Sequence, residues 1–304
     1  MKRILLAATA ALLFFAGDAV AANKLNVVTT IADLASITKE VGGDRVDVTS
    51  IARGYQDPHF VEPKPSFLML LRKADLLEVV GLELEVGWLP SLLDQSRNPN
   101  IRPGAKGYLD LSRGVEILDR PAGAVNRSMG DVHAMGNPHY WLDPANAVRI
   151  AIQVEKKLEE LRPADAAYFQ QRLNAFKGRM NEANKRWTAV MAPYRGAKIV
   201  TYHRSWSNFV KRFGLNVVGF VEPKPGVPPS PSHMFELINL MKQQKVKAIV
   251  MEPYFDVKTP QAIAERAGAK LVVMYPSVGG AKSGTDDYIA LFDTNIARLV
   301  KALQ

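Results

Sequence analysis

The sequence predicts an α/β protein of two lobes with mainly parallel sheets, joined by one long rigid helix. Short runs rich in Val, Ile and Leu alternate with helical patterns in both halves of the chain, which is typical of parallel sheets built from α/β units. One long amphipathic stretch lies between the two halves. Without an apolar leader, about 280 residues remain, more than the roughly 100–200 residues of one ordinary domain. We therefore expect two lobes.

The first residues have the three parts of a secretory signal peptide. Lys2 and Arg3 supply the positive charge, residues 4–16 the apolar segment, and residues 19–21 a small-x-small cleavage site. The apolar segment is shorter than the roughly 20 residues that span a bilayer. The alternative to a signal peptide is a buried N-terminal helix. We expect residues 1–21 to be a signal peptide and the mature protein to be periplasmic. The chain has no cysteine, so we expect no disulfide, no lipid anchor and no thiolate metal ligand.

The chain divides into three parts after the leader. We place an N-terminal α/β lobe at 22–162, the connecting helix at 163–193 and a C-terminal α/β lobe at 194–304. The strand candidates are KLNVVTTI, RVDVTSIA and ADLLEVVG in the first half, and KIVTYH, LNVVGFV, KAIVMEP and KLVVMYP in the second. Among the predicted helix starts, Thr259 is a candidate N-cap followed by Pro260, and Ser230 or Ser232 caps the preceding helix.

The connecting helix is predicted by one continuous apolar stripe. Its members follow one another at spacings of four and three residues: Phe169, Leu173, Phe176, Met180, Ala183, Trp187 and Val190. Pro163 opens the helix, and Pro193 with Gly196 closes it. Its length of roughly 42 Å suits a rigid connector between two lobes. The alternative is a long helix within one large domain.

Three of the five histidines lie where a ligand would bind. His59 follows the run RVDVTSIA across a loop, His139 lies in the loop before WLDP, and His203 ends the run KIVTYH. Ligands of open α/β sheets bind at the carboxyl ends of strands, so these side chains could converge between the lobes. Three neutral imidazoles suit zinc, copper, iron or nickel, with a carboxylate or water completing a tetrahedral zinc site. Taken singly, each histidine would more often be structural or solvent-facing.

Three segments resemble those of a known family. DPHFVEPKPS, NPHYWLDP and TYHRSWSNF are similar to the metal-binding segments of the cluster A-I solute-binding proteins, which serve zinc and manganese ABC importers. The resemblance covers essentially the whole mature chain. It implies a metal site between the lobes, with His59, His139 and His203 as ligands, and delivery of the ion to a membrane permease. Because similar manganese proteins often have glutamate at the third position, His203 favours zinc over manganese.

The fourth ligand is left open. The resemblance implies an Asp or Glu from the loop after the last core strand, but Pro276 stands at that position. The candidates are Glu252, at the end of KAIVMEP, Asp57 and water, of which we favour water or Glu252. We interpret His133 as a solvent-exposed loop histidine, with a weak metal contact as the alternative. We interpret His233, in the first turn of a helix, as a non-ligand.

The sequence favours a binding protein over an enzyme. A site of three histidines and one zinc ion also suits a hydrolase, but the chain has no HExxH, no paired carboxylates near a histidine and no GxSxG. The formal charge of +9 comes from scattered Lys and Arg, which indicates a solvated surface and no nucleic-acid partner. We therefore predict a monomeric, non-enzymatic protein that binds zinc, or alternatively manganese or another transition metal.

Overall fold

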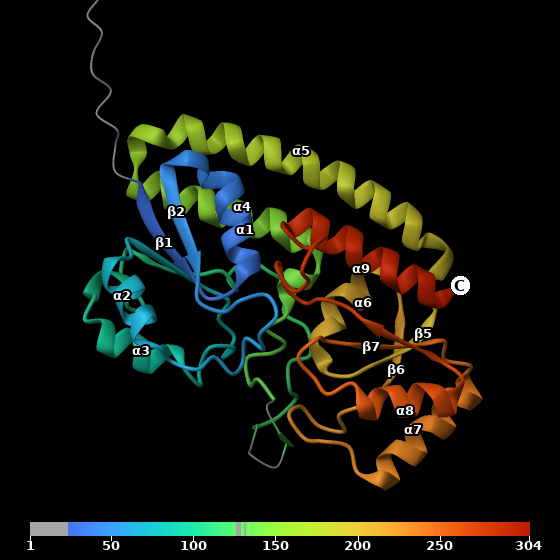
Figure 1. The fold of residues 1–304 in the computed structure, drawn as a ribbon. Helices are drawn as coiled ribbons and strands as arrows, with labels where there is room; N and C mark the ends of the chain where they lie inside the picture. The colour runs from blue at the N-terminus through green and yellow to red at the C-terminus, as the bar shows by residue number, and fades with distance from the viewer. Residues whose placement is uncertain (1–23, 126–128, 131) are drawn as a thin grey trace, which may run out of the picture.

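Two parallel sheets, one in each half of the chain, form the framework of the structure (Figure 1). The structure is a computed structural model that describes residues 24–125, 129–130 and 132–304. The predicted signal peptide, residues 1–21, lies outside the described residues. No helix among the described residues combines the length and the apolar character needed to cross a membrane.

The two sheets share one strand order. The first is ordered β2-β1-β3-β4 and the second β6-β5-β7-β8, and every neighbouring pair is parallel. The prediction of two α/β lobes with parallel sheets is confirmed, with one strand, β4, that the sequence analysis did not predict. The strands are β1 (Leu25–Thr29), β2 (Val46–Ser50), β3 (Leu76–Val79), β4 (Tyr108–Asp110), β5 (Lys198–Thr201), β6 (Asn216–Phe220), β7 (Ala248–Met251) and β8 (Lys270–Val273).

Helices cover both faces of each sheet. In Figure 1, α1 and α4 lie between the first sheet and α5, and α9 lies between the second sheet and α5; α2 and α3, and α7 and α8, cover the opposite faces. The α-helices are α1 (Ala32–Gly42), α2 (Pro65–Lys73), α3 (Leu89–Ser96), α4 (Pro144–Leu161), α5 (Ala166–Met191), α6 (Ser207–Phe213), α7 (Pro231–Gln244), α8 (Lys258–Ala267) and α9 (Tyr288–Leu303). Short 3₁₀ turns are η1 (Gly43–Arg45), η2 (Pro99–Ile101), η4 (Tyr140–Leu142), η5 (Pro163–Asp165), η6 (Ala192–Tyr194) and η7 (Arg204–Trp206).

Of two predicted N-caps, one is confirmed and the other is wrong. Ser230 caps α7, where its hydroxyl accepts a hydrogen bond from the His233 N–H at 3.2 Å. Thr259 is not a cap, because α8 begins at Lys258. The Asp256 carboxylate accepts from the Lys258 N–H at 2.7 Å, so an acceptor upstream of Thr259 satisfies a free donor at the start of the helix.

The connecting helix α5 runs along one side of the molecule past both lobes (Figure 1). It has 26 residues and is flanked by η5 and η6, and six of the seven predicted stripe residues are buried. The prediction is wrong for the last stripe residue: Val190 is 48% exposed, and its neighbour Met191, only 1% exposed, is buried instead. A strict repeat of seven residues drifts about 20° per heptad around a straight helix, so after three heptads the buried position has moved on by one residue.

One apolar core extends through both lobes. It contains Val27 and Leu34 of the first lobe, Phe176 of α5, and Phe209 and Leu299 of the second lobe. A second, smaller core lies beneath α7 and α8. The lobes therefore share buried apolar surface in addition to their covalent connection through α5.

Buried polar contacts also join the lobes directly. In α1, Asp33 accepts hydrogen bonds from the Ser277 hydroxyl and, at 3.2 Å, from the Val278 N–H. Nearby, the Tyr288 N–H at the start of α9 donates to the Ser36 hydroxyl at 3.1 Å. Burial raises the pKa of Asp33 to about 7, although both hydrogen bonds act in the opposite direction. These contacts hold the loop after β8 against the first lobe.

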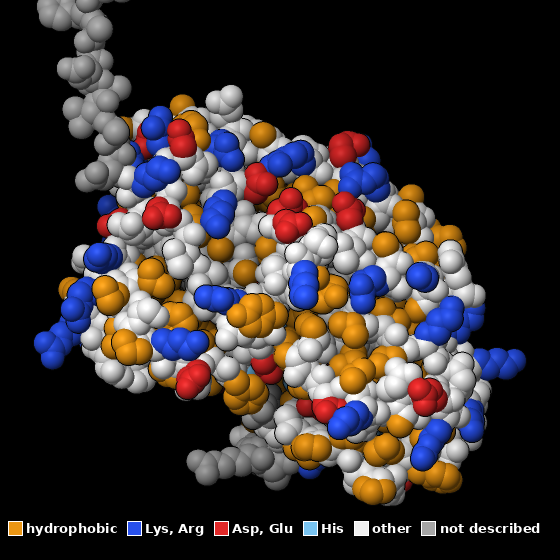
Figure 2. Space-filling view, viewed as in Figure 1, with side chains coloured by type: hydrophobic (Ala, Val, Ile, Leu, Met, Phe, Trp, Pro, Cys, Tyr) orange, Lys and Arg blue, Asp and Glu red, His pale blue; other side chains and the backbone are white. Residues whose placement is uncertain are grey.

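Charged side chains are dispersed over the surface. On the face shown in Figure 2, Lys and Arg are interspersed with Asp and Glu and do not gather into one basic patch. Several pairs are within ion-pair distance, such as Lys185 with Glu182 at 2.9 Å. This dispersion agrees with the interpretation of the basic residues as a solvated surface.

Glu78 in β3 makes the stability of the fold depend on pH. It is fully buried, and only one carboxylate oxygen has a partner, the Thr38 hydroxyl at 2.6 Å. Burial raises its pKa from 4.5 to about 8. Between these two pH values the folded state keeps a proton that the unfolded chain has released. Stability therefore falls as the pH rises, by about 1.4 kcal/mol per pH unit from this group.

We expect Glu78→Gln to remove this contribution, because glutamine has the same shape and does not titrate. Urea unfolding at pH 5, 6, 7 and 8 should show a shallower fall of the free energy of unfolding than in the unchanged protein, and a more stable variant at pH 8. The exposed Glu182→Gln is the matched control. Parallel stability curves for Glu78→Gln and the unchanged protein would contradict the prediction.

Candidate metal centre

Three histidines predicted from the sequence meet between the lobes. His59 lies in the segment after β2, His139 directly precedes η4, and His203 lies two residues beyond the end of β5. One ring nitrogen from each lies within 4.8 Å of those of the other two. The ring centroids are 5.1 Å apart for His59 and His139, and 5.7 Å from each of these to His203. The loops of both lobes thus bring three imidazoles to one point.

Each imidazole is oriented by an oxygen atom. The Nδ1 atoms of His59, His139 and His203 are hydrogen-bonded to Asp57 at 2.7 Å, to Asn137 at 2.9 Å and to Glu222 at 2.7 Å. A ring whose Nδ1–H donates to an oxygen has its Nε2 lone pair free. The Nε2 atom of His139 is buried and has no hydrogen-bond partner. The arrangement therefore offers three nitrogen lone pairs to one ion.

Two of the orienting bonds come from the same kind of local turn, which occurs at two places in the chain. In Asp57-Pro58-His59 and Asn137-Pro138-His139, the oxygen of the first residue accepts from both the backbone N–H and the ring Nδ1 of the histidine. Asp and Asn commonly bond the backbone two residues on, and the proline restricts the turn. The signal [DN]-P-H was present in the sequence. The sequence analysis considered Asp57 only as a ligand and missed Asn137 and Glu222.

The two aromatic residues after His139 fix its loop to both lobes. The Tyr140 hydroxyl donates to the carbonyl of Val80 at 2.9 Å, and the Trp141 indole N–H donates to the carbonyl of Pro276 at 2.8 Å. Both side chains are buried. Asp143 then caps α4 by accepting from the Ala145 N–H at 2.9 Å. Pro276, at the position where the resemblance implied an acid, here supplies a backbone acceptor that anchors the tryptophan.

Glu252 lies near His203 but outside the group of three histidines. It follows β7 directly and is fully buried. Neither of its oxygens makes a hydrogen bond of normal geometry, although the Ser205 hydroxyl lies next to it. Burial raises its pKa to about 7, and the charge of His203 acts in the opposite direction. It is not one of the residues whose ligand atoms lie within 4.8 Å of one another.

The histidines differ in their protonation. Burial, followed by the charges of His59 and His203, holds the pKa of His139 well below its ordinary value. Burial also lowers the pKa of His203, but the hydrogen bond to Glu222 and the charge of Glu252 outweigh it, and the net pKa is raised. His139 is therefore neutral at pH 7 and ready to act as a ligand.

The two remaining histidines lie in different surroundings. His133 was predicted to be solvent-exposed, but it is partly buried, and its Nε2 lies 3.2 Å from the Nε2 of His59. The prediction was wrong because the loop folds back across the site. Burial, followed by the charges of His59 and His203, lowers the pKa of His133 to about 4. His233 bonds the Phe220 carbonyl at 2.9 Å in the second lobe and is not in the histidine group.

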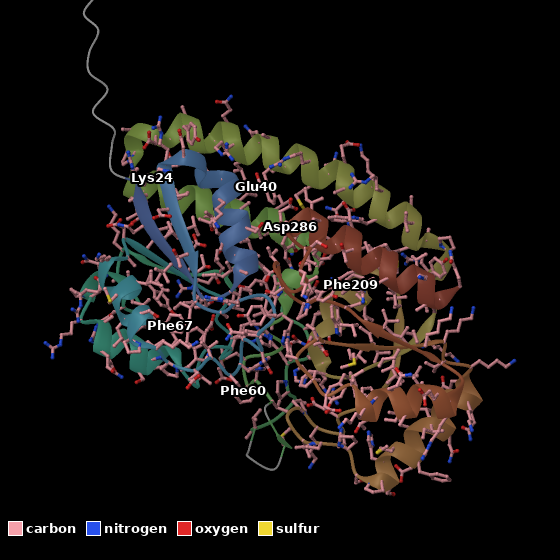
Figure 3. All side chains as sticks on the ribbon, in the orientation of Figure 1. Lys24, Glu40, Phe60, Phe67, Phe209 and Asp286 are labelled. Carbon is pink, nitrogen blue, oxygen red and sulfur yellow. The ribbon has the colours of Figure 1, made fainter. Side chains whose placement is uncertain are left out.

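The site opens on the side of the molecule away from α5. A cavity of about 350 Å³ is lined by His133, His139 and His203. Figure 3 places Phe60, the neighbour of His59, on that side, where the first lobe meets the segment between the lobes. An ion can thus approach without crossing the shared core.

Two α/β lobes, a long connecting helix and a small polar site between the lobes define a two-lobed solute-binding protein. The sequence profile of ZnuA, zinc-uptake complex component A periplasmic, matches residues 27–302. The chain belongs to this family.

Individual relatives are distant but cover nearly the whole chain. The manganese ABC transporter substrate-binding lipoprotein PsaA of Streptococcus pneumoniae is 26% identical over 294 residues, 92% of this chain and 89% of that protein. The zinc-binding lipoprotein AdcA of the same species (strain ATCC BAA-255 / R6) is 26% identical over 311 residues, 98% of this chain and 60% of that protein.

Solved structures have the same fold. A crystal structure of ZnuA has a TM-score of 0.77 at 24% identity and covers 93% of this chain and 100% of its own. A manganese-bound periplasmic metal-binding protein from Candidatus Liberibacter asiaticus has a TM-score of 0.74 at 19% identity, with the same coverage.

Proposed function

We propose that this protein captures a divalent metal ion, zinc in the first place, and delivers it to an ABC-type membrane permease. The observation that carries the proposal is the convergence of His59, His139 and His203, whose ligand nitrogens lie within 4.8 Å of one another. Each of the three rings is held by an oxygen on Nδ1. Such outer partners orient imidazole ligands and raise their basicity.

The donor set favours zinc over manganese. Imidazole nitrogen suits zinc, whereas manganese prefers sites rich in carboxylate and carbonyl oxygen. Two nearby carboxylates, Asp57 and Glu222, are engaged with histidine Nδ1 atoms. Manganese is the second candidate, since PsaA is named for manganese and AdcA for zinc. Glu252 is proposed either as a ligand or as a negative charge beside His203.

A binding role without catalysis is the best-supported interpretation. A zinc hydrolase needs a general base beside the metal-bound water. Asp57 and Glu222 are occupied in orienting histidines, and Pro276 replaces the acid expected after the last strand. The matching family comprises the A component of zinc-uptake complexes.

The lobe organisation supports capture with little lobe movement. We propose lobes at 22–162 and 194–304 and a rigid connecting helix at 163–193. The shared core and the contacts of Asp33 with the second lobe restrict separation of the lobes on the α5 side. We also propose that the protein is exported to the periplasm after removal of residues 1–21 and acts there as a monomer.

Metal titration tests the function. The protein is dialysed against a chelator, and zinc and manganese are then titrated separately by calorimetry at pH 7.5. We expect one zinc ion per chain and weaker binding of manganese. Failure to bind zinc would refute the proposal, and tighter binding of manganese would favour the second candidate. Glu252→Gln then separates its two roles: a loss beyond about 100-fold indicates a ligand, and a smaller loss indicates an outer charge.

A further inference from the structure

We propose that His133 is the fourth ligand of the ion, carried on residues 132–136, which fold across the site. This inference rests on the proposed function, since it completes the same site. It replaces the acid that Pro276 cannot supply with a fourth imidazole.

The distance between two nitrogen atoms carries the inference. His133 Nε2 lies 3.2 Å from His59 Nε2. Two nitrogen ligands of one tetrahedral zinc ion, each about 2.0–2.1 Å from the metal, are separated by about 3.3–3.4 Å. His133 thus stands at the spacing of a ligand neighbouring His59, but it lies outside the group of three whose ligand atoms are all within 4.8 Å of one another, so its ring has to move towards His139 and His203 when the ion binds. The two ring centroids are 5.2 Å apart, similar to the 5.1 Å between His59 and His139.

Hydrogen bonding explains how this contact is kept without an ion. His59 donates its Nδ1–H to Asp57, so its Nε2 is an acceptor. His133 then donates from its Nε2–H. When an ion binds, His133 moves that proton to Nδ1 and presents the Nε2 lone pair to the metal. The loop therefore already holds His133 against His59 before the ion arrives.

The first lobe holds this loop through an unusual turn. The Ala134 N–H donates to the Glu83 carboxylate at 2.7 Å. Glu83 and the preceding Leu82 have φ angles of +66° and +52°, in the left-handed region that residues other than glycine rarely adopt. Such backbone strain is often retained at binding sites because it aims a functional group. Here it directs Glu83 towards the loop that carries His133.

The second lobe meets the same part of the chain. A Cβ atom at Gly130 would lie 2.3 Å from the Pro225 carbonyl oxygen, so the backbone there packs closely on the second lobe. At the other end, the Gly136 N–H closes a turn on the His133 carbonyl at 3.1 Å. Contacts with both lobes position His133 over the gap between them.

The charges of the site are consistent with four neutral ligands. Asp57 and Glu222, behind His59 and His203, provide two negative charges within one imidazole of the ion. They match the charge of a divalent cation. Glu252 is not required as a ligand in this arrangement.

Cobalt(II) serves as the probe, because its visible absorption reports the number and type of ligands in zinc sites. The variants of the full chain are His133→Ala, Glu83→Gln and the control His233→Ala. For His133→Ala we expect a changed cobalt spectrum and zinc binding weakened by more than about 100-fold, as for the loss of a ligand. Added imidazole should restore the original spectrum. Glu83→Gln should keep the spectrum and weaken zinc binding less than His133→Ala does.

The outcomes separate this inference from the proposed function. If His133→Ala keeps the original spectrum and zinc affinity while His139→Ala loses binding, His133 is not a ligand and the function stands. If the unchanged protein binds neither zinc nor cobalt, the function fails and the inference fails with it. If imidazole does not restore the spectrum of His133→Ala, a ligand role for the ring is also contradicted.

Discussion

Zinc binding is expected to weaken by more than about 100-fold when His139 is replaced by alanine. Loss of an outer partner of a metal ligand typically costs 10–100-fold, and loss of the ligand itself should cost more. His139 is the most buried of the three histidines, at 2% exposed, and its Nε2 has no other partner. The buried position leaves little room for several waters to replace the ring. Competition with a chromophoric chelator measures the change.

A thermal scan supplies an independent readout of the same variant. Zinc at 100 times its Kd stabilises a one-site protein by about 2.7 kcal/mol, and this gain should disappear in His139→Ala. His233→Ala, whose ring bonds the Phe220 carbonyl away from the site, is the matched control and should keep the full shift. Equal zinc-induced shifts in both variants would show that His139 is not a ligand.

Replacing Trp141 by alanine should destabilise the fold by about 3–5 kcal/mol, as is usual for a large buried aromatic residue. The side chain is 1% exposed, and its indole N–H donates to the Pro276 carbonyl at 2.8 Å. Its ring also lies 5.2 Å from that of His139. The substitution therefore leaves a cavity, an unsatisfied carbonyl and a loosened ligand loop. Urea unfolding followed by circular dichroism measures the loss.

Two further variants make the Trp141 result interpretable. Trp141→Phe keeps an aromatic ring but loses the hydrogen bond, and we expect an intermediate loss. Phe235→Ala removes a side chain that is 66% exposed and should change stability by less than about 0.5 kcal/mol. A loss for Trp141→Ala no greater than for Phe235→Ala would mean that the anchor to Pro276 contributes nothing.

The framework and the three histidines could be predicted because they depend on local patterns. Alternation of apolar strands with helices reports a parallel sheet wherever it occurs, and the ends of such strands point to one edge. His59 and His203 follow strands in different halves, so a meeting between the lobes followed from topology. The burial of Phe169 to Trp187 followed from the helical period alone.

The partners of these residues could not be predicted in the same way. Glu222 reaches His203 from the residues after β6, and His133 reaches His59 through a loop without a regular pattern. Such contacts depend on how two loops fold against each other, and the periodic pattern of apolar residues in the sequence does not predict this. Met191 is buried in place of the predicted Val190 for a geometric reason: positions seven residues apart drift around a straight helix.

The three bonds that orient the ligand rings have a consequence for ion capture. Asp57 orients His59 from the same turn, Asn137 does so for His139, and Glu222 comes from the same lobe as His203. None of these bonds pairs a residue of one sheet-bearing half with a residue of the other. The orientation of His59 and His203 is therefore set within one half, whereas Asn137 also donates to the Arg204 carbonyl of the other half at 2.8 Å, which couples the orientation of His139 to the second lobe. A change in the gap between the lobes therefore acts both on the spacing of the three nitrogens and on the orientation of the His139 ring.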